Sequence, residues 1–104
     1  MKVEIFNYSV EKFIQTLNKE TIARVIHTIE LLEKFGNKLG LPHSKMVSRG
    51  IFELRIHSSQ NVRIFYAFSK NKAILLHGFI KKTSKIPKKE IGIAIRRFDG
   101  LEKQ

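Results

Sequence analysis

Several basic side chains in the second half of the chain have the types and spacing needed to bind and cleave a phosphodiester. Arginine can hold a phosphate through two parallel hydrogen bonds, while histidine and lysine can accept or donate a proton. Cleavage of RNA requires a base for the 2′-hydroxyl, cations for the charge that develops on the phosphate, and an acid for the leaving oxygen. The candidate catalytic residues are Arg55, His57, Arg63, His77 and Lys82.

The same residues also fit a strand face that binds phosphate without performing chemistry. His77 lies between Leu76 and Gly78, so a half-buried structural histidine is an equal alternative to a functional one. Arg63 is the residue that we expect at the centre of this polar face, with its side chain directed away from the core.

The positive charge of the chain is concentrated in its second half. The formal net charge is +11, and residues 1–42 contribute 6 basic and 5 acidic residues, whereas residues 43–104 contribute 14 and 4. Positive charge gathered on one surface attracts phosphate and releases counterions, so the basic half predicts a nucleic-acid partner. The residues that we expect to bind RNA are Lys45, Arg49, Lys81, Lys85, Lys88 and Lys89.

No metal or cofactor is expected. A two-metal nuclease would need clustered carboxylates, and the four in the basic half, Glu53, Glu90, Asp99 and Glu102, are scattered along the sequence. The chain has no cysteine, and it contains neither a phosphate-binding loop motif nor a dinucleotide-binding motif.

Three runs of alternating apolar and polar residues predict an antiparallel meander, because turn-forming residues separate them. These runs are residues 51–57, 62–68 and 73–81. A register that keeps the apolar side chains on one face also gathers the basic ones on the other. This register pairs Ile56 with Ile64, Tyr66 with Ile74, His57 with Arg63, and Arg63 with His77.

The remaining segments predict a strand and three helices. A short strand ends near Asn7, and Ser9 caps a first helix. A second, longer helix ends at Gly36, and a last helix runs from Pro87 to Gly100. The order is strand, two helices, three-stranded antiparallel meander and helix. We therefore expect a single α+β domain over residues 1–104, with one sheet face covered by helices and the other more polar.

The sequence favours a cytoplasmic protein. It lacks cysteine, its first residues lack the apolar core of a signal peptide, and no apolar stretch approaches the roughly 20 residues that cross a bilayer. No membrane partner is expected.

The basic half contains the segments LPHSKMVSRGIFELRI, NVRIFYAF and ILLHGFIKKTSKIPKKEIGIAIRR. Together they resemble the bacterial and phage HigB-type toxins of the RelE/ParE superfamily, over roughly residues 40–98. The resemblance implies a RelE-like fold in which a helical pair packs on an antiparallel sheet. It also implies ribosome-dependent cleavage of mRNA in the A site without metal, and a monomeric toxin that is silenced in a hetero-oligomer with its cognate antitoxin.

The resemblance assigns phosphate-facing roles to Arg55 and Arg63, and it matches Lys81 and Lys82 to the basic pair after the last strand. Some relatives place a catalytic tyrosine or histidine near the start of the last helix, where this chain has residues 86–88, Ile-Pro-Lys. The general acid and base therefore remain unassigned, with the histidines and lysines as substitutes. Two alternatives stay open: a gyrase-poisoning toxin of the ParE branch and a non-catalytic RNA- or DNA-binding module.

Overall fold

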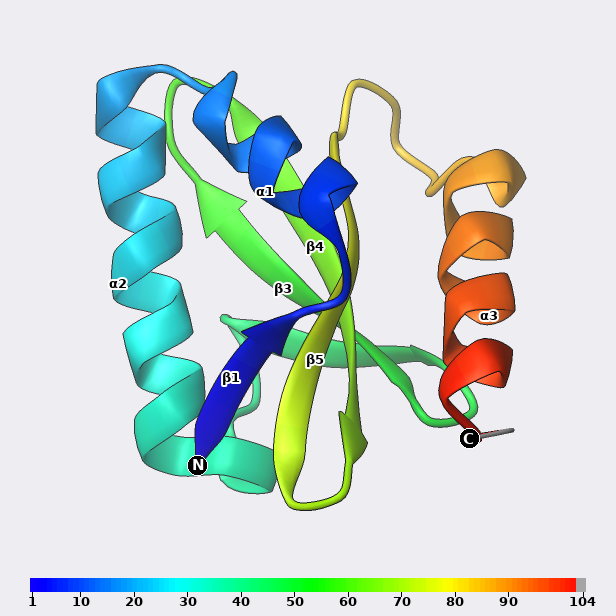
Figure 1. The fold of residues 1–104 in the computed structure, drawn as a ribbon. Helices are drawn as coiled ribbons and strands as arrows, with labels where there is room; N and C mark the ends of the chain where they lie inside the picture. The colour runs from blue at the N-terminus through cyan, green and yellow to red at the C-terminus, as the bar shows by residue number, and fades with distance from the viewer. Residues whose placement is uncertain (103–104) are drawn as a thin grey trace.

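A five-stranded mixed sheet forms the middle layer of the molecule, and helices cover both of its faces (Figure 1). The computed structural model describes residues 1–102. Its strand order is β1-β5-β4-β3-β2, in which β1 runs parallel to β5 and the other neighbours are antiparallel. The elements are β1 (Lys2–Ile5), α1 (Tyr8–Gln15), α2 (Lys19–Phe35), a 3-10 turn (Gly36–Lys38), β2 (Ser44–Ser48), β3 (Ile51–His57), β4 (Asn61–Ser69), β5 (Lys72–Ile80) and α3 (Lys88–Glu102).

Side-chain caps set the starts of the first two helices. The Asn7 side chain accepts a hydrogen bond from the backbone N–H of Ser9, and the Asn18 side chain accepts one from Thr21. The predicted cap at Ser9 is therefore wrong by two residues. Gly36 ends α2 as predicted, and its φ of 55° is in the left-handed region that favours glycine. The last helix does not end at Gly100 but continues to Glu102.

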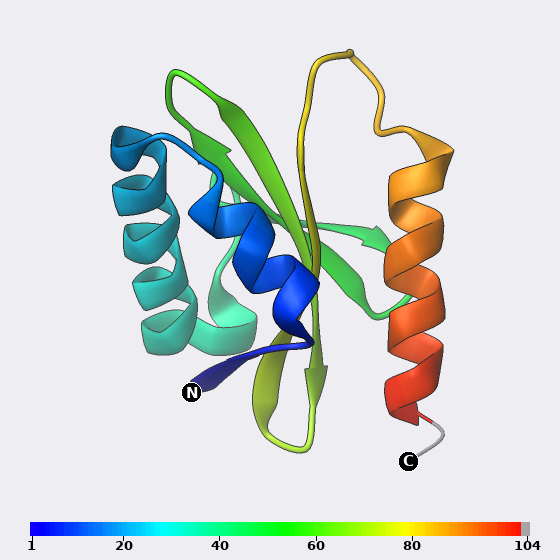
Figure 2. The same cartoon turned by 45° about the horizontal axis from the view of Figure 1, so that its top comes forward.

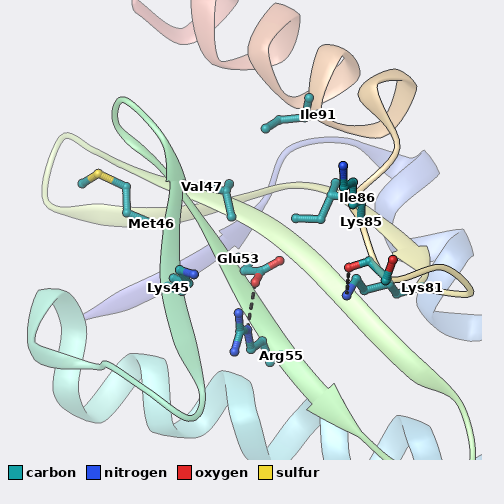
Figure 3. Close-up of a pocket in the computed structure, with 10 residues that line it drawn as sticks. Lys45, Met46, Val47, Glu53, Arg55, Lys81, Lys85, Ile86 and Ile91 are labelled. Carbon is teal, nitrogen blue, oxygen red and sulfur yellow. Dashed lines mark hydrogen bonds and ion pairs between the residues drawn. The ribbon is translucent and has the colours of Figure 1, made fainter.

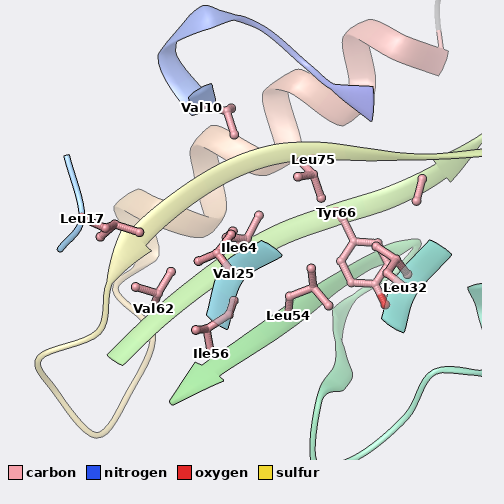
Figure 4. Packing of buried hydrophobic residues seen from close by; sticks show 11 residues of the cluster. Val10, Leu17, Val25, Leu32, Leu54, Ile56, Val62, Ile64, Tyr66 and Leu75 are labelled. Carbon is pink, nitrogen blue, oxygen red and sulfur yellow. The ribbon is translucent and has the colours of Figure 1, made fainter. Parts of the chain in front are cut away.

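Helices α1 and α2 lie on one side of the sheet and α3 on the other (Figure 2), and an apolar cluster lies on each face. The first packs α1 and α2 against the sheet, with Val10, Val25 and Leu54 among its fully buried members (Figure 4). The second packs α3 against the opposite face. Burial of apolar side chains on both faces is the main stabilising contribution here. The expectation that helices cover only one face is therefore wrong, because α3 also covers the more polar face, which carries Glu53, Arg55 and Arg63. The buried members of the second cluster are Ile51, Phe65, Ala67, Ile74, Leu76, Phe79 and Ala94.

The α+β class is confirmed, but the predicted element order lacks one strand. The sheet contains β2 as an edge strand, antiparallel to β3, within a segment whose Lys45 and Arg49 predict only basic surface. Alternation does not reveal it, because Ser44 is buried whereas Met46 is 55% exposed, and the pairing is irregular between Met46 and Ser48. Such short, irregular strands are common at sheet edges.

The predicted register between β3 and β4 is wrong by two residues. Arg55 lies opposite Arg63, and Ile56 lies opposite Val62 rather than Ile64. A shift of two residues keeps each side chain on its predicted face, because the side-chain period of a strand is two. Arg55 and Arg63 are therefore direct cross-strand neighbours.

A β-bulge interrupts the alternation of β5 side chains between the two faces of the sheet. Phe65 pairs with His77, but the next residue of β4, Tyr66, pairs with Leu75, so Leu76 is an extra residue in β5. The predicted pair of Tyr66 with Ile74 is therefore wrong, as is the pair of Arg63 with His77, because Arg63 lies opposite Phe79.

We predict that Tyr66 makes the stability of the fold sensitive to alkaline pH. Tyr66 lies within the first apolar cluster (Figure 4), and its buried hydroxyl is 2.5 Å from the Ser44 hydroxyl. Burial raises the pKa of Tyr66, and the hydrogen bond to Ser44 opposes this only in part. Because the folded pKa lies above the unfolded value of about 10, the contribution of this group is complete below that pH and is lost as the pH rises through the folded pKa.

Tyr66→Phe should cost about 1 kcal/mol near neutral pH through the lost hydrogen bond, but its stability should fall less between neutral and alkaline pH than that of the wild type. Urea unfolding across this pH range measures both effects. Tyr8→Phe is the control, since Tyr8 is 66% exposed. An alkaline loss in Tyr66→Phe as large as in the wild type would contradict the prediction.

Candidate functional site

A basic cleft of about 440 Å³ opens where β2 and β3 meet the loop after β5 and the start of α3 (Figure 3). Four cationic residues from three separate segments line it, and Glu53 is its single acidic lining residue within the described chain. The apolar wall of the cleft consists of Met46 and Val47 from β2, Ile86 just before α3, and Ile91 in α3. The lining residues are Lys45, Met46, Val47, Glu53, Arg55, Lys81, Ser84, Lys85, Ile86 and Ile91.

Glu53 is the buried anion of the cleft and holds Arg55 in place. Its side chain is only 3% exposed, and its Oε1 accepts a hydrogen bond of 2.8 Å from Nε of Arg55 (Figure 3). The Arg55 side chain is 27% exposed, so it reaches the cleft from this anchor. A charge-assisted hydrogen bond of this length restricts the guanidinium to one orientation.

Arg63 lies on the other side of the same carboxylate. Its Nε is 3.6 Å from Oε2 of Glu53, and neither of these two buried atoms has a hydrogen-bond partner among the described residues. Burial lowers the pKa of Arg63, the charge of Glu53 opposes this shift, and the neighbouring Arg55 adds to it. Arg63 is only 7% exposed and does not line the cleft, so its side chain lies beneath the cleft surface.

The loop between β5 and α3 brings two lysines to the cleft. The backbone N–H of Lys81 donates to the carbonyl of Asn61 at 2.7 Å, which continues the sheet pairing one residue beyond β5. The Lys81 ammonium donates to the Ser84 carbonyl, and the Thr83 hydroxyl donates to the Lys85 carbonyl. These local bonds fold the loop so that Lys81 and Lys85 line the same cleft as Arg55.

His77 holds α3 on the sheet. Its Nε2 lies 3.0 Å from Oε1 of Glu90 in the first turn of α3, and its ring stacks beside Phe65 and Phe79. Its side chain is 16% exposed, and it does not belong to the cleft lining. This geometry is that of the half-buried, hydrogen-bonded histidine considered from the sequence.

The other predicted residues do not gather at the cleft. His57 is exposed at the end of β3 and lines a different cavity, together with residues of α2. Arg49 lies in the turn between β2 and β3 and lines a third cavity, near Phe98 of α3. The remaining three are exposed and absent from the cleft lining. They are Lys82, Lys88 and Lys89.

Sequence reasoning missed the role of Glu53. The alternating pattern places Glu53 on the same face as Arg55 and Arg63, and this shared parity is the signal that could have identified an arginine–carboxylate cluster. The apolar wall formed by Val47, Ile86 and Ile91 was also missed, because neither β2 nor the path of the loop was predicted.

Within residues 1–102, no three His, Cys, Asp or Glu side chains are grouped so that they could hold a metal ion. In the same part of the chain, no helix has the length and apolar character needed to cross a membrane.

The fold and the cleft define a small, basic α+β protein with a cleft lined by three lysines and an arginine. The family model described as "Phage derived protein Gp49-like (DUF891)" matches residues 12–99, and the chain belongs to this family. It is a toxin-like family related to the RelE- and HigB-type toxins. No curated protein matches the chain significantly.

We predict that Glu53→Gln destabilises the fold by about 3 kcal/mol, because removing one partner of a buried ion pair leaves an uncompensated charge. Glutamine can still accept a hydrogen bond from Arg55, so the loss isolates the charge of the carboxylate. The matched control is Glu30→Gln, which should cost at most about 1 kcal/mol because Glu30 is an exposed residue of α2. Urea unfolding at neutral pH compares the two variants. An equal free energy of unfolding for Glu53→Gln and the wild type would contradict the prediction, because Arg55 and Arg63 would then not need a negative charge between them.

Proposed function

We propose that this protein is the toxin of a type II toxin–antitoxin pair and that it cleaves mRNA in the ribosomal A site without a metal ion. The supporting observation is the basic cleft, in which Arg55 is anchored by a buried carboxylate and three lysines lie around it. Membership of a toxin-like family supports the same proposal. Translating ribosomes are cytoplasmic, so this is also where the protein would act.

Arg55 is the residue that would bind the scissile phosphate. Because its Nε is engaged by Glu53, its two terminal nitrogens can face a phosphate as a pair. Lys45 from β2 and Lys85 from the loop would then neutralise further phosphate charge from either side of the cleft. Arg63 would act through the cluster, by balancing the charge of Glu53 beneath the cleft.

The expected reaction transfers the phosphoryl group within the RNA strand. The 2′-oxygen bonds to phosphorus as the bond from phosphorus to the 5′-oxygen breaks, so the products are a 2′,3′-cyclic phosphate and a 5′-hydroxyl. One proton leaves the 2′-hydroxyl and another reaches the departing 5′-oxygen. The amines of Lys45, Lys81 and Lys85 are the cleft groups that we propose for these proton transfers, because neither His57 nor His77 lines the cleft.

One observation favours a second candidate, a nucleic-acid-binding protein without chemistry. The described residues that line the cleft include no histidine, and the carboxylate of Glu53 is already engaged by guanidinium groups. A binding module, or a toxin of the gyrase-poisoning branch, would need the same positive surface but no general acid or base.

We predict that Arg55→Lys reduces mRNA cleavage by roughly a hundred- to a thousand-fold, because an ammonium cannot bind Glu53 and a phosphate in the same planar arrangement. The double variant Lys45→Gln and Lys85→Gln should also abolish growth arrest, and both lysines are exposed, so the fold should persist. The double variant Lys12→Gln and Lys19→Gln is the charge-matched control, because both lysines are exposed on α1 and α2, outside the cleft. Induced expression with growth curves and mapping of mRNA 5′ ends measures each effect, and circular dichroism checks the fold.

Each result of this experiment separates the candidate functions. Cleaved mRNA in the wild type and the control, but not in the cleft variants, would support the proposal. Growth arrest with intact mRNA and inhibited gyrase would replace it with the ParE-like function. RNA binding with neither arrest nor cleavage would leave a binding module.

The partner that would silence this toxin is an antitoxin with acidic and apolar residues. The cations of the cleft would bind the acidic residues of the antitoxin. Met46, which is 55% exposed and lines the same cleft, would contact its apolar residues. We predict a small acidic protein that co-purifies with the chain from its native operon. Lys45→Gln should slow association and weaken its dependence on salt, since exposed charges act mainly on the rate of encounter. Recovery of the chain alone, with no small partner encoded beside it, would count against a toxin–antitoxin pair.

A further inference from the structure

A second cavity, of about 140 Å³, collects basic side chains that the cleft does not use. Three of the four histidines of the chain line it, together with two arginines, and its described lining contains no acidic residue. We refer to it as the histidine cavity. Its lining residues are Arg24, His27, Thr28, Pro42, His43, Arg55, Ile56 and His57.

The fold brings these residues together from three segments. Arg24, His27 and Thr28 are three and four positions apart on α2, so they share one face of that helix. The Thr28 hydroxyl donates to the Arg24 carbonyl, and Thr28 is buried at 5% exposure. The first apolar cluster packs this side of α2 on the sheet, through residues such as Val25 and Ile56.

The segment before β2 closes the cavity. The backbone N–H of Arg55 donates to the carbonyl of His43 at 2.8 Å, which holds His43 beside the end of β3. His57 follows at the exposed end of the same strand. The histidine cavity is thus built on a helix and a strand, which keep their relative positions better than loops do.

The charge of Arg24 has no ion-pair partner among residues 1–102. The pair between Arg55 and Glu53 lies on the cleft side. Grouped cations repel one another, and an oxyanion is the ligand that relieves this repulsion. The volume has room for several water molecules and therefore for a phosphate group.

We propose that the histidine cavity is a second phosphate-binding site, which holds the backbone of the same RNA strand beyond the phosphate bound in the cleft. The proposal rests on the function proposed above. Arg55 connects the two sites, because it lines both the cleft and the histidine cavity. A strand that crosses Arg55 would therefore pass from the lysines of the cleft to Arg24 and the histidines. The free phosphate ion has the same chemistry as this backbone group, and the experiment separates the two.

The test measures binding of a short fluorescent oligouridylate by anisotropy as the salt concentration is varied. Its riboses carry 2′-O-methyl groups, so it cannot be cleaved and the result does not depend on catalysis. Loss of one phosphate contact lowers the slope of the logarithm of affinity against the logarithm of salt concentration by about 0.7 for a single strand. Arg24→Gln should show this decrease, and His27→Gln with His57→Gln should weaken binding as well.

Lys19→Gln is the matched control, because it removes the same charge from the same helix outside the cavity. The proposal is overturned if Arg24→Gln and Lys19→Gln change the slope equally, since the effect would then be general electrostatics. Thermal unfolding of each variant checks the fold, and His57→Gln alone changes only an exposed side chain.

A titration with inorganic phosphate, followed through the imidazole NMR signals of the protein, distinguishes the free ion from RNA. Saturable shifts of His27, His43 and His57 with phosphate, but no effect of Arg24→Gln on RNA binding, would overturn the assignment to RNA. If the slope decreases as expected while mRNA stays intact in cells, the second site stands and the nuclease function fails. The two proposals are therefore tested separately.

Discussion

A buried carboxylate between two guanidinium groups determines what the basic cleft can be. Glu53 holds the exposed Arg55 in one orientation and offsets the charge of the buried Arg63, across neighbouring positions of β3 and β4. Without this anion, two arginines that face each other across a sheet would repel one another. The cluster thus explains how a chain with a net charge of +11 can place positive charge against its own core.

The cleft also depends on the bulge in β5. The extra residue, Leu76, enters the apolar cluster under α3, and His77 beside it is directed to the same side, where it meets Glu90. Arg97 of α3 donates to the Leu76 carbonyl at 2.6 Å. The helix therefore contacts the bulge at two places, through Glu90 in its first turn and through Arg97 nearer its end. The position of α3 in turn places Ile91 as part of the cleft wall. A local irregularity in one strand therefore shapes the edge of the candidate site.

The alternating pattern of residues 51–57 predicted β3 and the common face of Arg55 and Arg63, because parity depends only on the strand period. The register could not be predicted, since the short turn at residues 58–60 and the bulge at Leu76 set it, and neither leaves a pattern in the sequence. Coverage of the polar face by α3 was missed because an amphipathic helix packs equally well on either side of a sheet. The sequence predicted the cationic residues of the cleft as parts of a basic surface. It could not predict that they line one cleft, because this depends on the path of the loop between β5 and α3.

The pairing of β1 with β5 has a consequence for how the chain reaches this structure. Lys2 to Ile5 lie beside residues 72–75, so β1 leaves the ribosome about seventy residues before the strand with which it pairs. Contacts of such large sequence separation slow folding, because the loop between them must close before they stabilise anything. The five-stranded sheet can therefore be completed only late in synthesis, and the lining of the cleft later still, because it includes Lys85 and Ile91. A newly made chain passes its first moments outside the ribosome without an assembled cleft.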